Sequence, residues 1–171
     1  MLIRLNIVQY LDIPYSEIRF GYGKYGKPYL LNYADYHFSV SHSEDCIVYV
    51  SDQHPIGIDV EQIKKCNFSV ARRCFTSYEN NFVANSADQN KAFFQIWTSK
   101  EAYVKMSGIG LTKPLKSFDI FSKNLGCHIS SICLDDYMVS ICSKNLMNTD
   151  IVVENIYVSS MLQNDFDRFE K

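Results

Sequence analysis

The 171-residue sequence lacks the features that identify membrane, secreted and nucleic-acid-binding proteins. No apolar run is long enough to span a bilayer, and Arg4, Asn6 and Gln9 interrupt the stretch where a signal peptide would have its apolar core. The formal net charge is only −2, so no overall field attracts nucleic acid or an anionic membrane. We therefore expect a cytoplasmic protein without a nucleic-acid or membrane partner.

The six cysteines lack the spacing of a metal site, because none forms a CxxC pair and no Cys/His grouping has zinc-finger spacing. The sequence predicts small, largely buried thiols in a reducing compartment. What the sequence does have is an ordinary globular composition, with 47% hydrophobic and 21% charged residues. This is enough for one sizeable core or two small packed halves.

Hydrophobic periodicity predicts a mixed, α+β chain. Helices are expected at residues 1–11, 68–75 and 78–84, and a long helix is expected from the N-cap Asp88 to the glycine stop at Gly108. Strands are expected at residues 18–20, 37–43, 46–51, 56–61, 118–121, 127–134, 137–143 and 150–158. The glycine-rich residues 21–30 are predicted to form a loop, and residues 163–171 a frayed end. The linker signal at Pro55 divides the chain into residues 1–55 and 56–171.

The motif GIDVE (residues 57–61) places two carboxylates on one face of a strand. Asp59 and Glu61 would repel each other unless a cation joined them, and oxygen ligands favour magnesium or manganese over zinc. Ile58 and Val60 point to the opposite face, toward the core. Taken alone, the acidic pair is also compatible with a solvated strand edge.

The motif WTSKEAYVK (residues 97–105) places Trp97, Glu101 and Lys105 on one helical face, with Lys100 at its margin. This pattern is compatible with ordinary Glu–Lys pairs beside a core tryptophan. It is also compatible with a third metal carboxylate flanked by lysines that receive phosphate oxygens. Two further segments are compatible with phosphate binding: His42 between two serines at a strand end, and Lys27 in the glycine-rich loop. A lone histidine is more often structural, and the loop by itself is a weak signal.

Together and in this order, YGKPYL (residues 25–30), FSVSHS (38–43), GIDVE and the long helix with WTSKEAYVKMSGIGL (97–111) resemble the 4′-phosphopantetheinyl transferases. The likeness is closer to the larger, surfactin-synthetase-activating type than to the small trimeric holo-acyl-carrier-protein synthases. It implies an α+β fold of two pseudo-symmetric α/β halves with coenzyme A bound in the cleft between them. Because this chain begins inside the first conserved helix, its N-terminal half (residues 1–55) is expected to be incomplete.

The resemblance implies an enzyme that moves the phosphopantetheine arm of coenzyme A to a serine of an apo acyl or peptidyl carrier protein. The reaction would depend on magnesium, with manganese as an alternative, and would release adenosine 3′,5′-bisphosphate. A non-catalytic module that binds coenzyme A or the carrier protein is the alternative function. Both a monomer and a dimer are compatible with the sequence.

The same resemblance implies roles for individual residues. Asp59, Glu61 and Glu101 match the metal ligands. His42 and Lys105 match groups that touch the coenzyme A phosphates, and Lys100 is a further candidate for that contact. The remaining substrate-binding candidates are Ser41 at the phosphate-binding strand end, Lys27 and Pro28 beside the adenine, and Arg4 near the 3′-phosphate.

Two expectations concern proton transfer and the protein partner. Glu101 is the first candidate for the base that activates the attacking serine, and Glu79 is the second. The surface of residues 68–82 carries Arg72 and Arg73 among apolar side chains, which suits an acidic carrier protein. The same pattern also fits an amphipathic helix packed on the core.

Overall fold

A three-stranded antiparallel sheet forms the centre of the computed structural model, which describes residues 2–145. Its strand order is β5 (Ile56–Gln62), β7 (Tyr137–Ser143) and β6 (His128–Leu134). In this register Ile58 lies opposite Ile141, and Asp59 lies opposite Ser140. The expected alternation along β5 is confirmed, since Ile58 and Val60 are buried in an apolar cluster with Val139 and Ile141.

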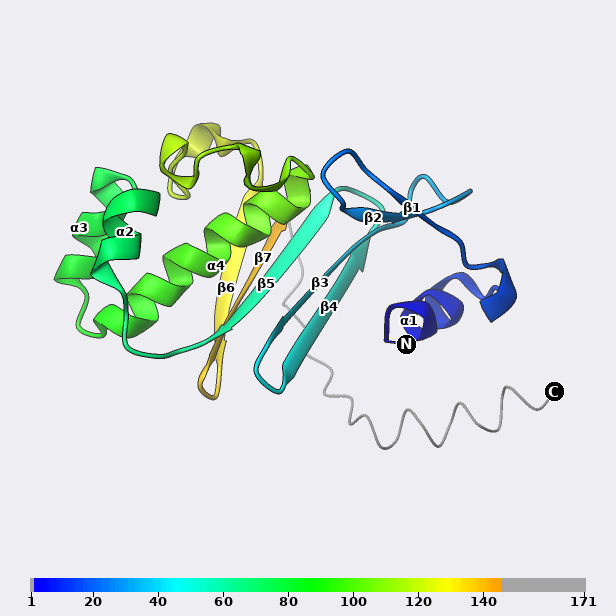
Figure 1. Cartoon of the computed structure of the whole chain (residues 1–171), viewed down its shortest axis with the longest axis horizontal. Coiled ribbons are helices and arrows are strands. Elements are labelled where there is room, and N and C mark those ends of the chain that lie inside the picture. The colour runs from blue at the N-terminus through cyan, green and yellow to red at the C-terminus, as the bar shows by residue number, and fades with distance from the viewer. Residues whose placement is uncertain (1, 146–171) are drawn as a thin grey trace.

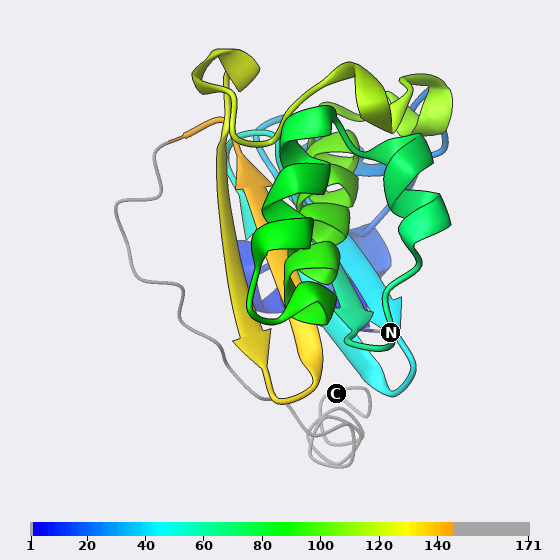
Figure 2. The same cartoon turned by 90° about the vertical axis from the view of Figure 1, so that its left-hand side faces the viewer.

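One long helix, α4 (Gln89–Ser107), covers one face of this sheet, and α2 (Phe68–Cys74) and α3 (Ser77–Asn85) lie near it (Figures 1 and 2). Both predicted ends of α4 are confirmed. The Asp88 side chain accepts from the Lys91 amide, and Gly108 ends the helix with a φ of 65°, in the left-handed region. The helix therefore begins and ends at the positions that its capping residues predict.

The close approach of α4 to β5 depends on Gly57. A Cβ atom at this position would collide with the backbone of Ala102 and Met106, so only glycine permits the observed contact. Ala102, Met106 and Cys142 fill the resulting interface. Asp59, two residues along the same face of β5, is consequently held directly beneath α4.

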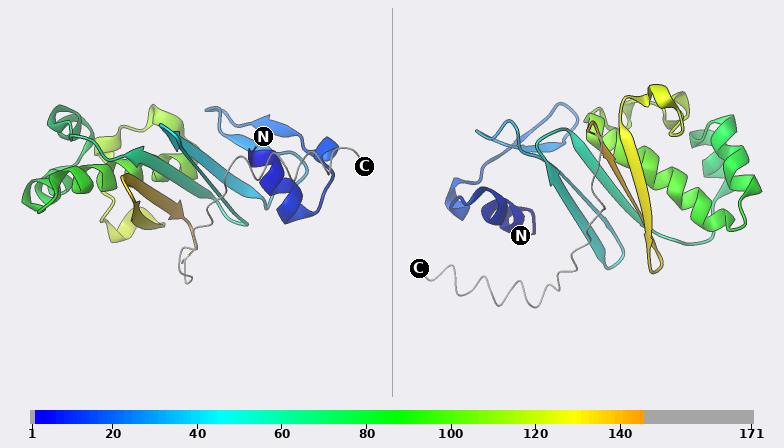
Figure 3. Two further views of the ribbon diagram at one scale, coloured as in Figure 1. Left: turned by 90° about the horizontal axis from the view of Figure 1, so that it is seen from below. Right: turned by 180° about the vertical axis from the view of Figure 1, so that it is seen from behind.

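The N-terminal part of the chain has its own small core (Figures 1 and 3). Its elements are α1 (Leu2–Leu11), the hairpin β1–β2 (Phe20–Tyr22 and Pro28–Leu30) and the hairpin β3–β4 (His37–Ser43 and Cys46–Asp52). The buried members of this core are Ile7, Ile18, Leu30, Tyr36 and Phe38. The predicted helix is thus confirmed over residues 2–11, and the predicted strands at 37–43 and 46–51 are confirmed as well.

Serine side chains on β3 join this part of the molecule to β5. Ser39 Oγ accepts from the Ile58 amide at 3.1 Å, and Ser43 Oγ accepts from the Gln62 amide at 3.1 Å. Between them, Ser41 donates to Asp59. Within residues 2–145, β3 and β5 belong to different sheets, so hydroxyl groups replace a backbone ladder at this junction. The division near Pro55 itself stays a prediction.

Three predictions of secondary structure were wrong. The strand expected at residues 18–20 forms only at Phe20, where β1 begins. The expected loop at residues 21–30 contains two residues of β1 and all of β2. The expected strand at 118–121 does not form, because its backbone bonds to side chains: Phe118 O accepts from Lys100, Ile120 N donates to Glu79, and Phe121 N donates to Asp119. The predictions for residues 150–158 and 163–171 lie outside the described residues. None of the helices described within residues 2–145 is long and apolar enough to cross a membrane.

Candidate active site

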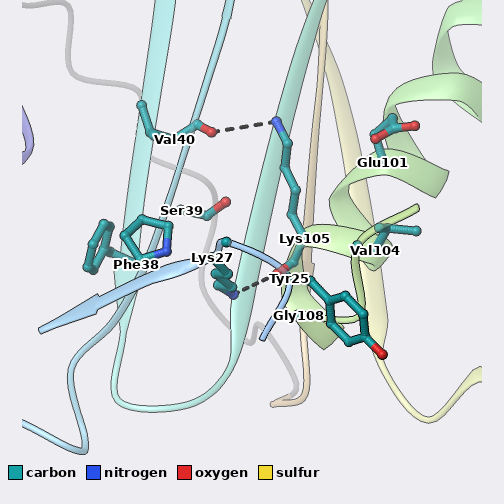
Figure 4. A pocket seen from close by; sticks show the side chains of 12 residues that line it. Tyr25, Lys27, Phe38, Ser39, Val40, Glu101, Val104, Lys105 and Gly108 are labelled. Atoms are coloured by element: carbon teal, nitrogen blue, oxygen red, sulfur yellow. Dashed lines mark hydrogen bonds between the residues drawn. The ribbon is translucent and has the colours of Figure 1, made fainter. Parts of the chain in front are cut away.

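A pocket of about 290 Å³ lies where the β2, β3 and α4 elements meet (Figure 4). Its walls come from residues 25–28 of the β1–β2 hairpin, from residues 38–40 of β3, and from Glu101, Val104 and Lys105 of α4. Gly108 and Gly110 close the end beyond α4. The pocket therefore borders both the N-terminal part of the chain and the sheet–helix unit.

Asp59 does not line this pocket, but it contacts Lys105, which does, and it is almost completely buried. Its Oδ1 atom accepts from Ser41 Oγ at 2.8 Å and from Lys105 Nζ at 2.8 Å. Its Oδ2 atom is buried and makes no hydrogen bond with the described residues. A buried carboxylate oxygen without a partner is energetically unfavourable, so this atom needs a ligand or a proton.

Asp59, Glu61 and Glu101 lie close enough for their charges to interact. Burial raises the pKa of Asp59, and the charge of Glu61 raises it further against the opposing effect of Lys105. Burial likewise raises the pKa of Glu101, with added contributions from Asp59 and Glu61. Glu61 accepts a hydrogen bond from Ser43 at 3.0 Å. Three carboxylates thus share one electrostatic site, in which a cation would relieve their repulsion.

Lys105 supplies positive charge to this site. Its side chain extends from α4 toward β3, as Figure 4 shows, and Nζ lies 2.7 Å from Ser41 Oγ and 3.5 Å from Val40 O. The side chain is 31% exposed, compared with 7% for Asp59. The ammonium group is therefore accessible enough to meet an anionic ligand in the pocket.

Lys27 and Pro28 both line the pocket, but the Lys27 ammonium is directed elsewhere than expected. It donates to the backbone oxygens of Lys105 at 2.6 Å and Ile56 at 3.0 Å. Burial lowers the pKa of Lys27 to about 8. In this geometry its charge is engaged by carbonyl groups.

Lys100 and Glu79 are placed in the core, which argues against the roles expected for them. Both side chains are 0% exposed and form an ion pair at 2.8 Å. Lys100 also donates to Leu115 O and Phe118 O, and Glu79 accepts from the amides of Thr76 and Ile120. Lys100 therefore has no access to a phosphate, and Glu79 has no free oxygen with which to accept a proton from a substrate.

Arg4 and His42 are not brought into the pocket. Arg4 donates to Ile18 O at 2.9 Å, and its guanidinium lies over the rings of Tyr15 and Phe20. His42 is exposed on β3, beside Ser41 in sequence but not among the residues that line the pocket. Asp59, Glu61 and Ser41 do not line the pocket either, but hydrogen bonds and charge effects join them to Lys105 and Glu101 in its wall. Within residues 2–145, Arg4 and His42 lie apart from this group.

The donor set fits a hard divalent cation in its chemistry. Only oxygen ligands are offered, and Asp59 Oδ2 is buried and unpartnered among the described residues. Within residues 2–145, however, no three acidic, histidine or cysteine side chains are already arranged to hold a metal ion. Lys105 provides the neutralising charge in this arrangement.

Ser39 and Ser43 lie within the FSVSHS motif, but no role was predicted for either of them. Each accepts from a β5 amide, so they fix the position of β5 relative to β3. A signal for them was present, because Ser39, Ser41 and Ser43 alternate along one strand and must share a face.

Comparison with known proteins identifies the family of this chain. The model of the 4′-phosphopantetheinyl transferase superfamily matches residues 55–153. A 4′-phosphopantetheinyl transferase of Bacillus subtilis is 38% identical over 132 residues, which are 76% of this chain and 58% of that protein. The gsp transferase of Aneurinibacillus migulanus is 37% identical over 69% of this chain and 50% of its own length. The chain thus spans about half the length of the curated relatives it matches.

Among solved structures, the holo-[acyl-carrier-protein] synthase of Thermotoga maritima matches with a TM-score of 0.47 and 21% identity, over 64% of this chain and 73% of that one. The family assignment rests on the sequence matches, and the residues that match the family model include both acidic motifs of the site. More than half of the chain matches that model, and a relative with 38% identity aligns with three quarters of it. The chain belongs to the 4′-phosphopantetheinyl transferase superfamily.

Proposed function

We propose that this chain transfers the 4′-phosphopantetheine group of coenzyme A to a serine of an apo carrier protein and releases adenosine 3′,5′-bisphosphate. The observation that carries the proposal is the ion pair between Asp59 and Lys105, because Lys105 lines the pocket together with Glu101. Membership of the superfamily supports the same reaction. The donor and the carrier protein are therefore the proposed substrates.

In the proposed reaction the serine oxygen forms a bond to the phosphorus that bears the pantetheine arm. The bond from that phosphorus to the bridging oxygen breaks, and the electron pair leaves with the nucleotide phosphate. Lys105 lies where it can stabilise the negative charge that develops on the leaving oxygens, since its ammonium is partly exposed at the pocket edge. The pocket wall formed by Tyr25, Gly26 and Pro28 would hold the nucleotide.

Glu101 is the proposed acceptor for the serine proton. Its carboxyl group lines the pocket, and its raised pKa, caused first by burial, brings its basicity closer to that of a useful general base. Glu79 is not retained in this role because both of its oxygens are engaged inside the core.

Asp59, Glu61 and Glu101 would hold the proposed magnesium ion, with Asp59 Oδ2 as the oxygen that lacks a partner among the described residues. Magnesium, when bound, supplies charge neutralisation to a pyrophosphate and to the oxygens of a phosphoryl transfer. Because these side chains are not already arranged around one point, we expect them to move when the ion binds. Manganese offers the same oxygen chemistry.

The carrier protein is proposed to dock on α2. Arg72 and Arg73 are exposed there, and Phe68 is 44% exposed at the start of the helix. A basic surface with one aromatic side chain suits an acidic helix of a partner. Phe75 does not contribute, because it is fully buried in the core between α2, α3 and α4.

Binding without transfer is the second candidate function, and the lack of a ready-made three-ligand site within residues 2–145 favours it. Intact-mass spectrometry and calorimetry separate the two candidates. Incubation of an apo carrier protein with coenzyme A, magnesium and the chain is expected to give a carrier heavier by one phosphopantetheine. Binding of coenzyme A by calorimetry without any mass gain, across several carriers, would instead support the second candidate.

A further inference from the structure

The ammonium group of Lys27 lies at the C-terminal end of α4, although Lys27 itself belongs to the hairpin that forms the other wall of the pocket. Nζ donates to Lys105 O at 2.6 Å and to Ile56 O at 3.0 Å, and Met106 O lies 3.5 Å away. Figure 4 shows the first of these bonds. One side chain therefore connects three elements: the β1–β2 hairpin, the start of β5 and the last turn of α4.

The end of a helix attracts a cation for two reasons. The last carbonyl groups of α4 have no amide partner within the helix, and the helix dipole places partial negative charge there. Gly108 N satisfies Val104 O at 3.1 Å, which leaves the next two carbonyls, of Lys105 and Met106, for Lys27. Burial lowers the pKa of Lys27 to about 8, which reflects how far the ammonium is withdrawn from solvent.

The connection extends to the reacting groups. On the hairpin side, Lys27 O accepts from Gly23 N at 2.9 Å, and its neighbours Gly26 and Pro28 line the pocket. On the helix side, the residue whose carbonyl accepts from Lys27 is Lys105, whose own side chain reaches Asp59. A shift of the hairpin relative to α4 would therefore change the pocket wall and the position of Lys105 together.

We propose that Lys27 is a positioning residue, which holds the β1–β2 hairpin against the last turn of α4 and so maintains the shape of the pocket. The identity of the ligand in this inference rests on the proposed function. It acts through the backbone of α4, not through contact with the nucleotide. A phosphate would have to compete with three carbonyl oxygens for the same ammonium group.

The test compares Lys27→Met with the wild-type chain and with Lys91→Met, a control at the opposite, exposed end of α4. Hydrogen–deuterium exchange of the ligand-free proteins is followed in peptides covering residues 20–31 and 104–112. Loss of charge-assisted hydrogen bonds is expected to speed exchange in both peptides by about tenfold in Lys27→Met only. The dissociation constant of coenzyme A, from calorimetry, is expected to rise by about tenfold.

A second variant, Lys27→Arg, keeps a cationic donor and is expected to restore most of both properties, which also covers the case in which Lys27→Met does not fold. Weaker binding of coenzyme A with unchanged exchange in the two peptides would show that Lys27 contacts the nucleotide directly and would overturn the proposal. Unchanged binding and unchanged exchange would overturn it as well. If exchange is faster in Lys27→Met but the wild-type chain does not bind coenzyme A, the structural link is supported and only the proposed function is contradicted.

Discussion

The helix α4 carries two lysines that are each ion-paired to a carboxylate at 2.8 Å, and the two pairs have opposite environments. Lys100 and Glu79 are both 0% exposed. Their remaining polar atoms bond to backbone groups of residues 76 and 115–120. Lys105 is 31% exposed, and its partner Asp59 keeps one buried oxygen without a hydrogen bond to the described residues.

The difference separates a structural ion pair from the pair for which we propose a function. A buried pair whose hydrogen bonds are all satisfied stabilises one arrangement of the chain and has nothing left to offer a ligand. A pair with an unpartnered carboxylate oxygen and an accessible ammonium group is incomplete until a ligand binds. The distance between the charges is the same in both pairs, so hydrogen-bond satisfaction and exposure distinguish them.

The largest expected effect is on stability, at the buried pair. Lys100→Met leaves the Glu79 carboxylate without its cation in the core and should lower the free energy of unfolding by about 3–5 kcal/mol, measured by urea denaturation. The transfer rate per folded molecule should stay within a few-fold of wild type. A large loss of rate in a folded Lys100→Met protein would break the distinction between the two lysines.

Lys105→Met should have the opposite profile. The transfer rate should fall by about 100-fold, the scale of losing one charge-stabilising group in a transition state, as measured by intact mass of the carrier over time. The loss of unfolding free energy should stay below about 2 kcal/mol, because Asp59 can take up a proton in place of its ion pair. A rate close to that of wild type would remove Lys105 from the site.

The dependence of stability on pH should be visible at Asp59 and Glu101. Both carboxyl groups have raised pKa values, caused first by burial, so folding disfavours their charged forms. Their contribution to stability is therefore fully present below the unfolded-state pKa values of 3.8 and 4.5 and is lost as pH rises through the raised folded-state values. Asp59→Asn should flatten this part of the curve of melting temperature against pH.

Magnesium should oppose that loss, since it favours the ionised carboxylates. Thermal melting with and without magnesium should show the larger stabilisation at neutral pH and little effect near about pH 4, where the ligands bind protons. Equal stabilisation at both pH values, or the same increase in Asp59→Asn, would place the ion elsewhere.

A third ion pair between a lysine and a carboxylate gives the smallest expected effect on stability. Lys64 and Glu44 lie 2.6 Å apart, but both side chains are more than half exposed. Lys64→Ala should change the free energy of unfolding by no more than about 0.5 kcal/mol and leave transfer unchanged. A destabilisation approaching that of Lys100→Met would mean that side-chain exposure does not determine how much each ion pair contributes to stability.

Much of the fold was predictable from local chemistry. The cap at Asp88, the stop at Gly108 and the alternation of GIDVE depend on neighbouring residues only, and the structure agrees with them. The missing strand at 118–121 depends on Lys100 and Glu79, which come from distant parts of the sequence and bind its backbone. Hydrophobic periodicity carries no information about a contact of that kind.

The site was predictable to a lesser degree, for the same reason. The motif placed Lys105 on the helical face of Glu101, but it left Lys100 as a second candidate for contact with phosphate, and only the burial of Lys100 argues against that contact. Lys27 shows the limit most clearly, because its partners are backbone oxygens of residues 56 and 105, which carry no signal in the sequence. Burial and hydrogen-bond satisfaction were needed to assign these side chains.

The most direct test of the central claim is the intact mass of an apo carrier protein after incubation with coenzyme A, magnesium and either wild-type or Asp59→Asn protein of verified stability. The amide introduced by this substitution could still accept from Ser41 and Lys105, but the negative charge of the incomplete pair would be lost. We predict a gain of one phosphopantetheine with the wild-type chain and a rate at least about 100-fold lower with the variant. Equal rates for the two proteins would contradict the assignment of Asp59 and Lys105 as the functional pair.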